Sequence, residues 1–470
     1  MRLSRIRLGE LAAAVLLATP VLVLCSPSGF TAAATIAGGA TAGLSAGHQA
    51  SRSARAGVVG NVATIGVGQL PTSVAIDPLS GTVWVVNSLS NTVSEISAAS
   101  RAVIATIDVG MSPVDVAVDQ KTGTVWVTCL GPYDDPSADN TVSEISEASR
   151  KVIATIKVGL VPFGIAADSR TGTVWVANTN SDTVSEISEA RQEVVATINT
   201  GPGAAPVSLA TDPGSGLVWV DRPGGPVQEI SEATKSVVGS TDVSPGAGSS
   251  SLNAIVVDPD TGAAWVASDF YSGGSYVSYA SAVAPAARRV TAGVLVSKPQ
   301  WYTNIADGIA VDPATGTVWV AENGGDTVTL ISGGAEAVAR NLATGDGPVA
   351  VAVDSRTGTV WIVNNGDDTV TEYTYASPEF TTSPQAKLVA GRPATVTVLT
   401  RGFPLAAMRV DGPVPAGMRV RIGQGSVVIS GRPALSARNH TFPVVVSADN
   451  GVGTASGQYV FTQQLVIEVS

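Results

Sequence analysis

Aromatic and acidic side chains in the irregular segments of this sequence are its best candidates for holding a ligand. Flat rings stack on sugars and on other proteins, and carboxylates accept hydrogen bonds from hydroxyl and amide groups. Such a mixture, carried on loops of a rigid scaffold, is typical of a binding surface. The predicted ligand-binding residues are Trp301, Tyr302, Phe270, Tyr271, Asp134, Asp135, Asp307 and Glu322.

Patterns for nucleophilic, nucleotide-dependent or metal-dependent catalysis are missing from the sequence. Its two histidines, His48 and His440, lie outside the repeated region described below, and no phosphate-binding loop or paired His/Cys spacing occurs. We therefore predict no catalytic residue, no cofactor and no metal site. The alternative is carboxylate chemistry, which needs an Asp or Glu with a raised pKa. Glu322 is the first residue to test for it, because most repeat units carry a small residue or Asn there.

A repeated pattern predicts the elements that position these residues. The pattern Val-Ala-(Ile/Val)-Asp-x-x-x-Gly-Thr-Val-Trp-(Val/Ile) occupies 74–85, 116–127 and 351–362, with degenerate copies between them. Successive tryptophans are 42, 49, 44, 46, 54 and 42 residues apart. A period of about 40–45 residues with four strands per unit indicates a β-propeller. Seven buried tryptophans predict seven blades: Trp84, Trp126, Trp175, Trp219, Trp265, Trp319 and Trp361.

Each unit contains four predicted strands, which in the first unit are 73–77, 82–87, 92–97 and 102–109. The seventh unit lacks its fourth strand, whereas residues 61–68 have the pattern of one. We expect 61–68 to pair with the last blade and close the ring, because closure hides exposed strand edges. The Asp that ends each first strand is expected to accept backbone N–H groups in the following turn.

Insertions concentrate on one predicted face of the ring. Loops 129–140 and 268–274 join the second and third strands of units two and five, and 293–307 leads from unit five to unit six. These connections share one mouth of a propeller's central channel, which we predict to be the working face. The structural alternative is that Phe270, Tyr271 and the nearby tyrosines fill a poorly formed fifth blade.

The repeat resembles the YVTN-type propeller repeat over residues 61–374, which implies a secreted or cell-surface propeller. The streptogramin (virginiamycin B) lyases are similar seven-bladed proteins. That resemblance implies histidines and a glutamate around magnesium in the central mouth. The propeller region of this sequence has no histidine, so the lyase residues have no counterpart.

A second β pattern follows the repeat. We predict a linker over 377–384 and an immunoglobulin-like β-sandwich over 385–470. Its segments 414–418, 428–433 and 442–453 resemble the bacterial putative Ig repeat, which implies a non-catalytic extracellular module.

The N-terminus predicts export from the cell. Residues 1–34 read as a signal peptide with an Arg-rich start, an apolar stretch and a small-residue cleavage site, and 35–57 as a disordered leader before the propeller at 58–376. An uncleaved anchor and lipidation at Cys25 are the alternatives. No later segment resembles a membrane span. The net charge of -11 disfavours nucleic acid as a partner.

The sequence thus predicts an all-β protein, a seven-bladed β-propeller followed by an immunoglobulin-like sandwich, that is secreted or attached to the cell surface. Its expected function is binding or scaffolding, with an extracellular glycan, cell-wall component or protein as partner. The alternative is an extracellular carboxylate-dependent hydrolase or lyase.

Overall fold

The computed structural model describes residues 61–132, 139–243, 249–272, 275–284, 288–296, 306–332, 337–403, 406–450, 452 and 460–470. These residues form strands almost throughout, and their few helical turns are single 3-10 turns. None of the described helices has the length and apolar character needed to cross a bilayer. The predicted signal peptide and leader, with Cys25 and His48, lie outside the described residues.

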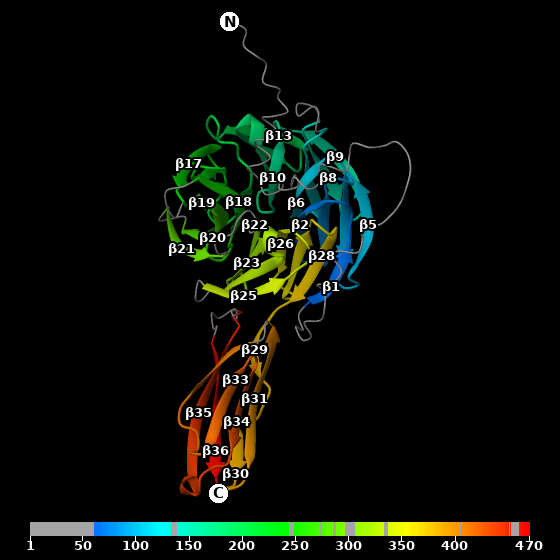
Figure 1. Ribbon diagram of the computed structural model, residues 1–470. Helices are drawn as coiled ribbons and strands as arrows, with labels where there is room; N and C mark the ends of the chain where they lie inside the picture. The colour runs from blue at the N-terminus through cyan, green and yellow to red at the C-terminus, as the bar shows by residue number, and fades with distance from the viewer. Residues whose placement is uncertain are drawn as a thin grey trace, which may run out of the picture.

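Within the described residues, seven four-stranded antiparallel sheets follow one another along the chain (Figure 1). The first three consist of β2 (Pro71–Asp77), β3 (Thr82–Asn87), β4 (Thr92–Ser97), β5 (Ala102–Asp108), β6 (Pro113–Asp119), β7 (Thr124–Cys129), β8 (Thr141–Ser146), β9 (Lys151–Lys157), β10 (Pro162–Asp168), β11 (Thr173–Asn178), β12 (Thr183–Ser188) and β13 (Glu193–Asn199). The next three consist of β14 (Leu209–Asp212), β15 (Leu217–Val220), β16 (Val227–Ser231), β17 (Ser236–Thr241), β18 (Ser249–Val257), β19 (Ala264–Ser272), β20 (Ser275–Ala284), β21 (Arg289–Leu295), β22 (Ala306–Asp312), β23 (Thr317–Glu322), β24 (Thr327–Ser332) and β25 (Ala337–Ala343). The last comprises β26 (Pro348–Asp354), β27 (Thr359–Asn364), β28 (Thr369–Thr374) and β1 (Asn61–Gly66). The 3-10 turns here are η3 (Thr179–Ser181) and η4 (Asn323–Gly325).

Strand β1 closes the ring, as the sequence predicted. It pairs antiparallel with β28 and completes the seventh sheet, although some 300 residues separate the two strands. The backbone N–H of Leu70 also donates to Asp368 Oδ1 at 2.8 Å. The two ends of the repeated region are therefore held together by hydrogen bonds.

The repeated tryptophans pack each sheet against the next one. Trp84 lies in one apolar cluster with Val125 and Val127 of the second sheet, and Trp361 of the seventh sheet lies with Val83 and Val85 of the first. The contacts thus run in a circle, which is the arrangement of a β-propeller. Each tryptophan is buried, so its apolar surface stabilises a sheet-to-sheet interface.

The Asp residues at the ends of the first strands accept backbone N–H groups in the turns that follow, as predicted. In all seven sheets the Asp that ends the first strand accepts the backbone N–H two residues further on; for Asp77 the distance to Leu79 N is 2.8 Å. These carboxylates shape turns that join the first and second strands.

The glutamates of the third strands are buried, although they alternate along the strand with apolar residues. Glu95 accepts from Arg150 Nε at 2.7 Å, and Arg150 belongs to the next sheet. The same contact between neighbouring sheets recurs for Glu144 with Gln192, Glu186 with Lys235, Glu229 with Arg288 and Glu372 with Arg101. Strand alternation alone did not reveal this burial, because the partner comes from a different sheet.

Eight further strands form two four-stranded sheets around one apolar core at the C-terminal end. The strands are β29 (Ala376–Phe380), β30 (Gln385–Leu388), β31 (Ala394–Phe403), β32 (Ala407–Asp411), β33 (Met418–Gly423), β34 (Ser426–Gly431), β35 (His440–Asp449) and β36 (Phe461–Val469), with the 3-10 turn η5 (Leu435–Ala437). Residues 377–380 of the predicted linker are thus part of a strand, because β29 pairs with the edge of β31.

The C-terminal sheets contact the propeller beside the turns that join first and second strands. Val452 is buried in one cluster with Trp319 and Tyr375, and the N–H of Tyr375 donates to Gly358 O in such a turn at 2.8 Å. Figure 1 shows the C-terminal strands extending away from the propeller. The opposite ends of the first strands, where Asp307 lies, are away from this contact.

Candidate functional site

A cavity of about 390 Å³ lies where the first strands of all seven sheets meet. These strands are β2, β6, β10, β14, β18, β22 and β26, the innermost strand of each sheet. One edge of an innermost strand has no neighbouring strand, so its backbone N–H and C=O groups are available to the cavity. The wall therefore offers both hydrogen-bond donors and acceptors.

Asp115 is a fixed polar group on this wall. Its carboxylate accepts from Ser73 Oγ at 2.6 Å, from its neighbour Val116 N at 2.9 Å and from Ile165 N at 3.0 Å. Burial raises the pKa of Asp115, and these hydrogen bonds act in the opposite direction. Because Ser73 and Ile165 belong to the first and third sheets, Asp115 links three sheets around the axis.

Beside Asp115, the second to fourth sheets contribute an apolar patch to the wall. Val114, Phe163 and Val207 occupy matching positions near the starts of β6, β10 and β14 and form one cluster. Leu130, which follows β7, packs against them. This part of the wall suits the apolar face of a ligand.

The wall formed by the fifth and sixth sheets is acidic. Asp307 is 5% exposed, lines the cavity, and neither of its carboxylate oxygens has a hydrogen-bond partner among the described residues. Burial raises the pKa of Asp307 well above its usual value, and the charge of Asp269 raises it further; the Asn323 side chain acts against this. Asp269 itself is held by Asn253 Nδ2 at 2.6 Å and Ser278 Oγ at 2.5 Å.

Glu322 lies near this acidic wall but does not line the cavity. Its side chain is 1% exposed and accepts a hydrogen bond from the Thr329 hydroxyl. Burial raises the pKa of Glu322 to about 7; the Thr329 hydrogen bond lowers it and the charge of Asp269 raises it. Asp269 thus acts on both Asp307 and Glu322.

The aromatic residues of the fifth sheet lie in a hairpin, which corrects the prediction of a loop over 268–274. Strands β19 and β20 stay paired up to Ser272 and Ser275, with Phe270 opposite Val277. Phe270 is buried and its ring meets that of Tyr279 edge-to-face at 5.6 Å. Phe270 is therefore a packing residue, in line with the structural alternative.

Of the other five predicted binding residues, the structure describes the backbone of one. Tyr271 lies in β19, and its side chain is outside the described part of the chain. Trp301, Tyr302, Asp134 and Asp135 lie outside the described residues. Among those of the eight whose side chains the structure describes, Asp307 and Glu322 lie near one another and Phe270 packs within its own sheet.

Sequence reasoning missed Asp115, Asn253 and Asp269. Asp115 was detectable, because it stands four residues before the turn Asp119, where the other units have Ser, Gly or Ala. Asn253 was detectable in the same way, because it is a polar residue five positions before the turn residue Asp258 of its own unit. The role of Asp269 depends on a neighbouring sheet, so no spacing within its own unit predicts it.

Asp221 is a second buried carboxyl with no hydrogen-bond partner for either oxygen among the described residues, but it does not line the cavity. Burial raises its pKa well above the usual value. The fifth and sixth sheets have Ala267 and Ala321 at this position. We expect Asp221→Ala to stabilise the fold by about 1–3 kcal/mol, because it removes an unsatisfied buried group. Chemical denaturation at neutral pH measures the change, and a less stable variant would contradict this view.

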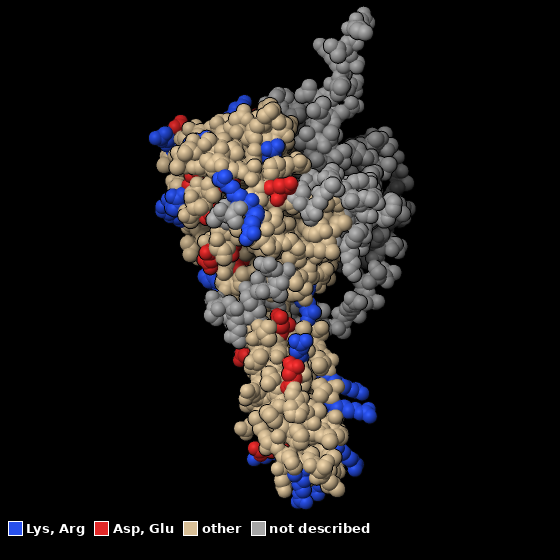
Figure 2. Space-filling view, turned by 90° about the vertical axis from the view of Figure 1, so that its left-hand side faces the viewer, with Lys and Arg blue, Asp and Glu red and all other residues tan. Residues whose placement is uncertain are grey.

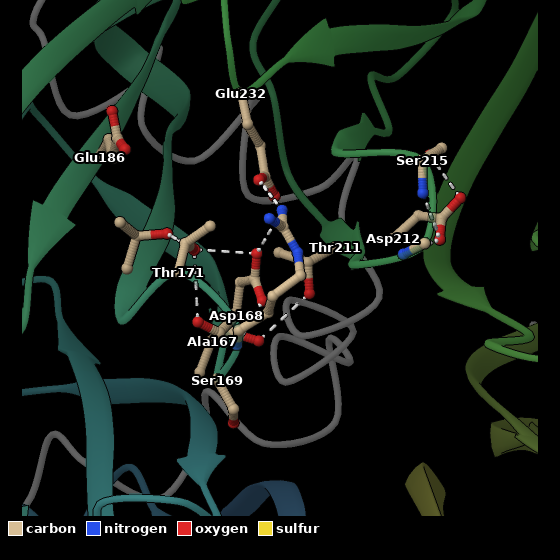
Figure 3. A network of polar contacts seen from close by, with 12 residues as sticks. Ala167, Asp168, Ser169, Thr171, Glu186, Thr211, Asp212, Ser215 and Glu232 are labelled. Carbon is tan, nitrogen blue, oxygen red and sulfur yellow. Dashed lines mark hydrogen bonds and ion pairs between the residues drawn. The ribbon is translucent and has the colours of Figure 1, made fainter.

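Pairs of carboxyl groups join sheets at the other end of the first strands. Figure 3 shows Glu232 of the fourth sheet directed toward Asp168 of the third. Arg170 lies between them, at 2.6 Å from Glu232 and 3.2 Å from Asp168. Burial and the charge of Asp168 raise the pKa of Glu232 to about 7, and Arg170 lowers it.

Two other interfaces repeat this pairing. Burial raises the pKa of Glu147 to about 7, and the charge of Asp77 on the neighbouring sheet contributes. Burial, with Asp119 as hydrogen-bond partner, raises the pKa of Glu189 to about 8. No group of three or more His, Cys, Asp or Glu suited to a metal ion occurs within the described residues.

Similarity to known proteins supports the fold and leaves function open. No protein-family model and no curated protein matches the chain. Among solved structures, the chain is similar to Kuenenia stuttgartiensis hydrazine synthase, with a TM-score of 0.58 and 20% sequence identity. The match covers 65% of this chain and 96% of that one. With the repeated four-stranded sheets, this likeness supports a β-propeller.

Proposed function

We propose that this protein is a secreted binding or scaffold protein. In this proposal a YVTN-type propeller of seven blades, residues 58–376, captures an extracellular glycan, cell-wall component or protein, and an immunoglobulin-like module, residues 385–470, carries it. The observation that supports binding most directly is the central cavity, whose wall combines Asp115 and Asp307 with Phe163. A small number of polar groups in an otherwise apolar pocket is typical of a ligand site.

The distribution of charge supports an extracellular surface as the partner. Residues 376–470 carry eight Lys or Arg against four Asp or Glu, whereas the whole chain has a net charge of -11. Figure 2 shows basic side chains projecting from the C-terminal sheets, whereas basic and acidic side chains are mixed on the propeller face in view. A basic module suits attachment to an anionic wall polymer.

The alternative is a carboxylate-dependent hydrolase or lyase. The raised pKa values of Glu322 and Asp307 favour it. It requires two carboxyl groups that both reach a substrate. Glu322 is buried and does not line the cavity, and Asp115 and Asp307, which do, belong to the second and the sixth sheet. Binding is therefore our first proposal.

The proposal predicts that Trp301→Ala combined with Tyr302→Ala weakens capture of the protein on purified cell walls or immobilised glycans by at least about tenfold, since loss of aromatic anchors costs 1–3 kcal/mol or more. Pull-down at several protein concentrations measures this. The matched control is Ile104→Ala with Ile153→Ala, two exposed residues on outer strands.

Capture of the double variant at the level of the control would refute Trp301 and Tyr302 as binding residues. Melting curves of both variants show whether folding is intact. Failure of the unaltered protein to bind any wall or glycan preparation would refute a glycan or cell-wall component as its partner.

A further inference from the structure

Asp307 is a buried carboxyl group on the cavity wall, and no Lys, Arg or His of the described residues forms an ion pair with it. It is 5% exposed, and neither carboxylate oxygen has a hydrogen-bond partner among the described residues. A buried carboxylate is costly unless a cation or several donors compensate it. The protein supplies such partners to Asp115 and Asp269, whose oxygens accept hydrogen bonds from neighbouring residues.

We propose that the cavity binds the protonated amino group of an amino sugar, with Asp307 as its counter-ion. This inference rests on the proposed function and names the chemical class of its glycan. An ammonium group next to Asp307 supplies both the opposite charge and the hydrogen-bond donors that the carboxylate lacks.

The charge of the whole wall favours a cation. Asp115 and Asp307 line the cavity, and no Lys, Arg or His is among the described residues that do so. Asp269 adds a third carboxyl group next to Asn253, directly behind the wall. An anionic ligand would meet only like charges here, which costs several kcal/mol.

An organic cation fits better than a bare metal ion. Metal sites of hard cations collect several oxygen ligands around one point, and the described residues contain no group of three or more acidic, His or Cys side chains that does so. An ammonium group needs only one carboxylate and nearby acceptors, which Asp307 and the strand edges provide.

The remainder of the wall suits a sugar ring. The volume of about 390 Å³ lies within the range of small-molecule pockets. The free edges of the innermost strands offer N–H and C=O groups to sugar hydroxyls, and the Ile165 N–H that donates to Asp115 shows that these groups reach the cavity. Phe163, on the apolar side, can pack against the C–H face of the ring.

The test compares a chitosan oligosaccharide, whose amines are protonated, with the N-acetylated oligosaccharide of the same length, in titration calorimetry at a pH that keeps the amines charged. We expect the unaltered protein to bind the first at least about tenfold more tightly. Asp307→Asn removes this preference. The matched control Asp221→Asn keeps it, because Asp221 is also buried and has no hydrogen-bond partner among the described residues, but does not line the cavity.

The other outcomes are equally informative. Equal affinity for the two oligosaccharides, or full affinity in Asp307→Asn with an unchanged melting curve, overturns the amino-sugar inference and leaves glycan binding standing. Equally tight, Asp307-dependent binding of putrescine or of calcium chloride alone shows a general amine or metal site and overturns it as well. Absence of binding to both oligosaccharides and to cell walls refutes the glycan and cell-wall partners of the proposed function, and the amino-sugar inference with them.

Discussion

Ile65→Asp is expected to destabilise the propeller by about 4 kcal/mol or more, because it replaces a buried apolar side chain with a charge. Ile65 lies in β1, and its side chain belongs to the cluster that contains Trp361 of the seventh sheet and Val74 of the first. The substitution therefore weakens the one interface where the two ends of the ring meet. Deletion of residues 58–68, which removes β1 entirely, should lower the melting temperature still more.

The neighbouring residue provides the matched control. Thr64 is exposed in the same strand, opposite Thr371, so Thr64→Asp introduces the same charge without burying it. Differential scanning calorimetry of the unaltered protein, Ile65→Asp and Thr64→Asp measures the difference in melting temperature. If Ile65→Asp melted at the temperature of Thr64→Asp, closure of the ring by β1 would contribute little to stability and our account of it would be wrong.

The second large effect is a loss of stability as the pH rises from about 4.5 to 8. Glu147, Glu189 and Glu232 have folded-state pKa values of about 7, 8 and 7, each raised first by burial. In the unfolded chain a Glu titrates near its usual value of about 4.3. Between these values the folded state holds more protons than the unfolded state, so the free energy of unfolding decreases with rising pH.

The stabilising contribution is complete below the unfolded pKa and is lost as the pH passes the folded pKa. The melting temperature should therefore be several degrees higher at pH 5 than at pH 8. The triple variant Glu147→Gln, Glu189→Gln and Glu232→Gln keeps a donor toward each Asp partner and cannot ionise. We expect its melting temperature to depend less on pH.

Glu193→Gln serves as the control, because Glu193 is exposed on an outer strand. Calorimetric scans across this pH range compare the three proteins. A triple variant whose melting temperature follows the same pH dependence as the unaltered chain would show that the carboxyl pairs do not cause it.

Much of the propeller was predictable because its signals are local and repeated. The spacing of the tryptophans, the Asp before each first turn and the extra fourth-strand pattern at 61–68 can all be recognised by comparing one repeat unit with the next. The structure agrees on the four-stranded sheets and on the pairing of β1 with β28. Predictions were weaker where a short irregular segment met a neighbour, as at the hairpin of β19 and β20 and at β29.

The eight residues chosen for ligand binding show where this reasoning reaches its limit. Aromatic content and loop length pointed to Phe270, yet its ring packs against Tyr279 inside the fifth sheet. Position in the repeat pointed to Glu322, which is buried and does not line the cavity. Of the chosen residues that the structure describes, Asp307 alone lines the cavity, and Asp115 was not chosen although it is held there by groups from three sheets.

The sequence by itself determined the repeated unit, its strands and the strand that closes the ring, since hydrophobic alternation and turn residues act within a few neighbouring positions. Only the tertiary structure decided which polar groups meet. Glu95 accepts a hydrogen bond from Arg150 of the next sheet. The charge of Asp168 raises the pKa of Glu232, and that of Asp269 raises the pKa of Asp307, each across a boundary between sheets. Such contacts depend on how whole sheets pack, so burial and charge at these positions follow from the packing and not from residue spacing.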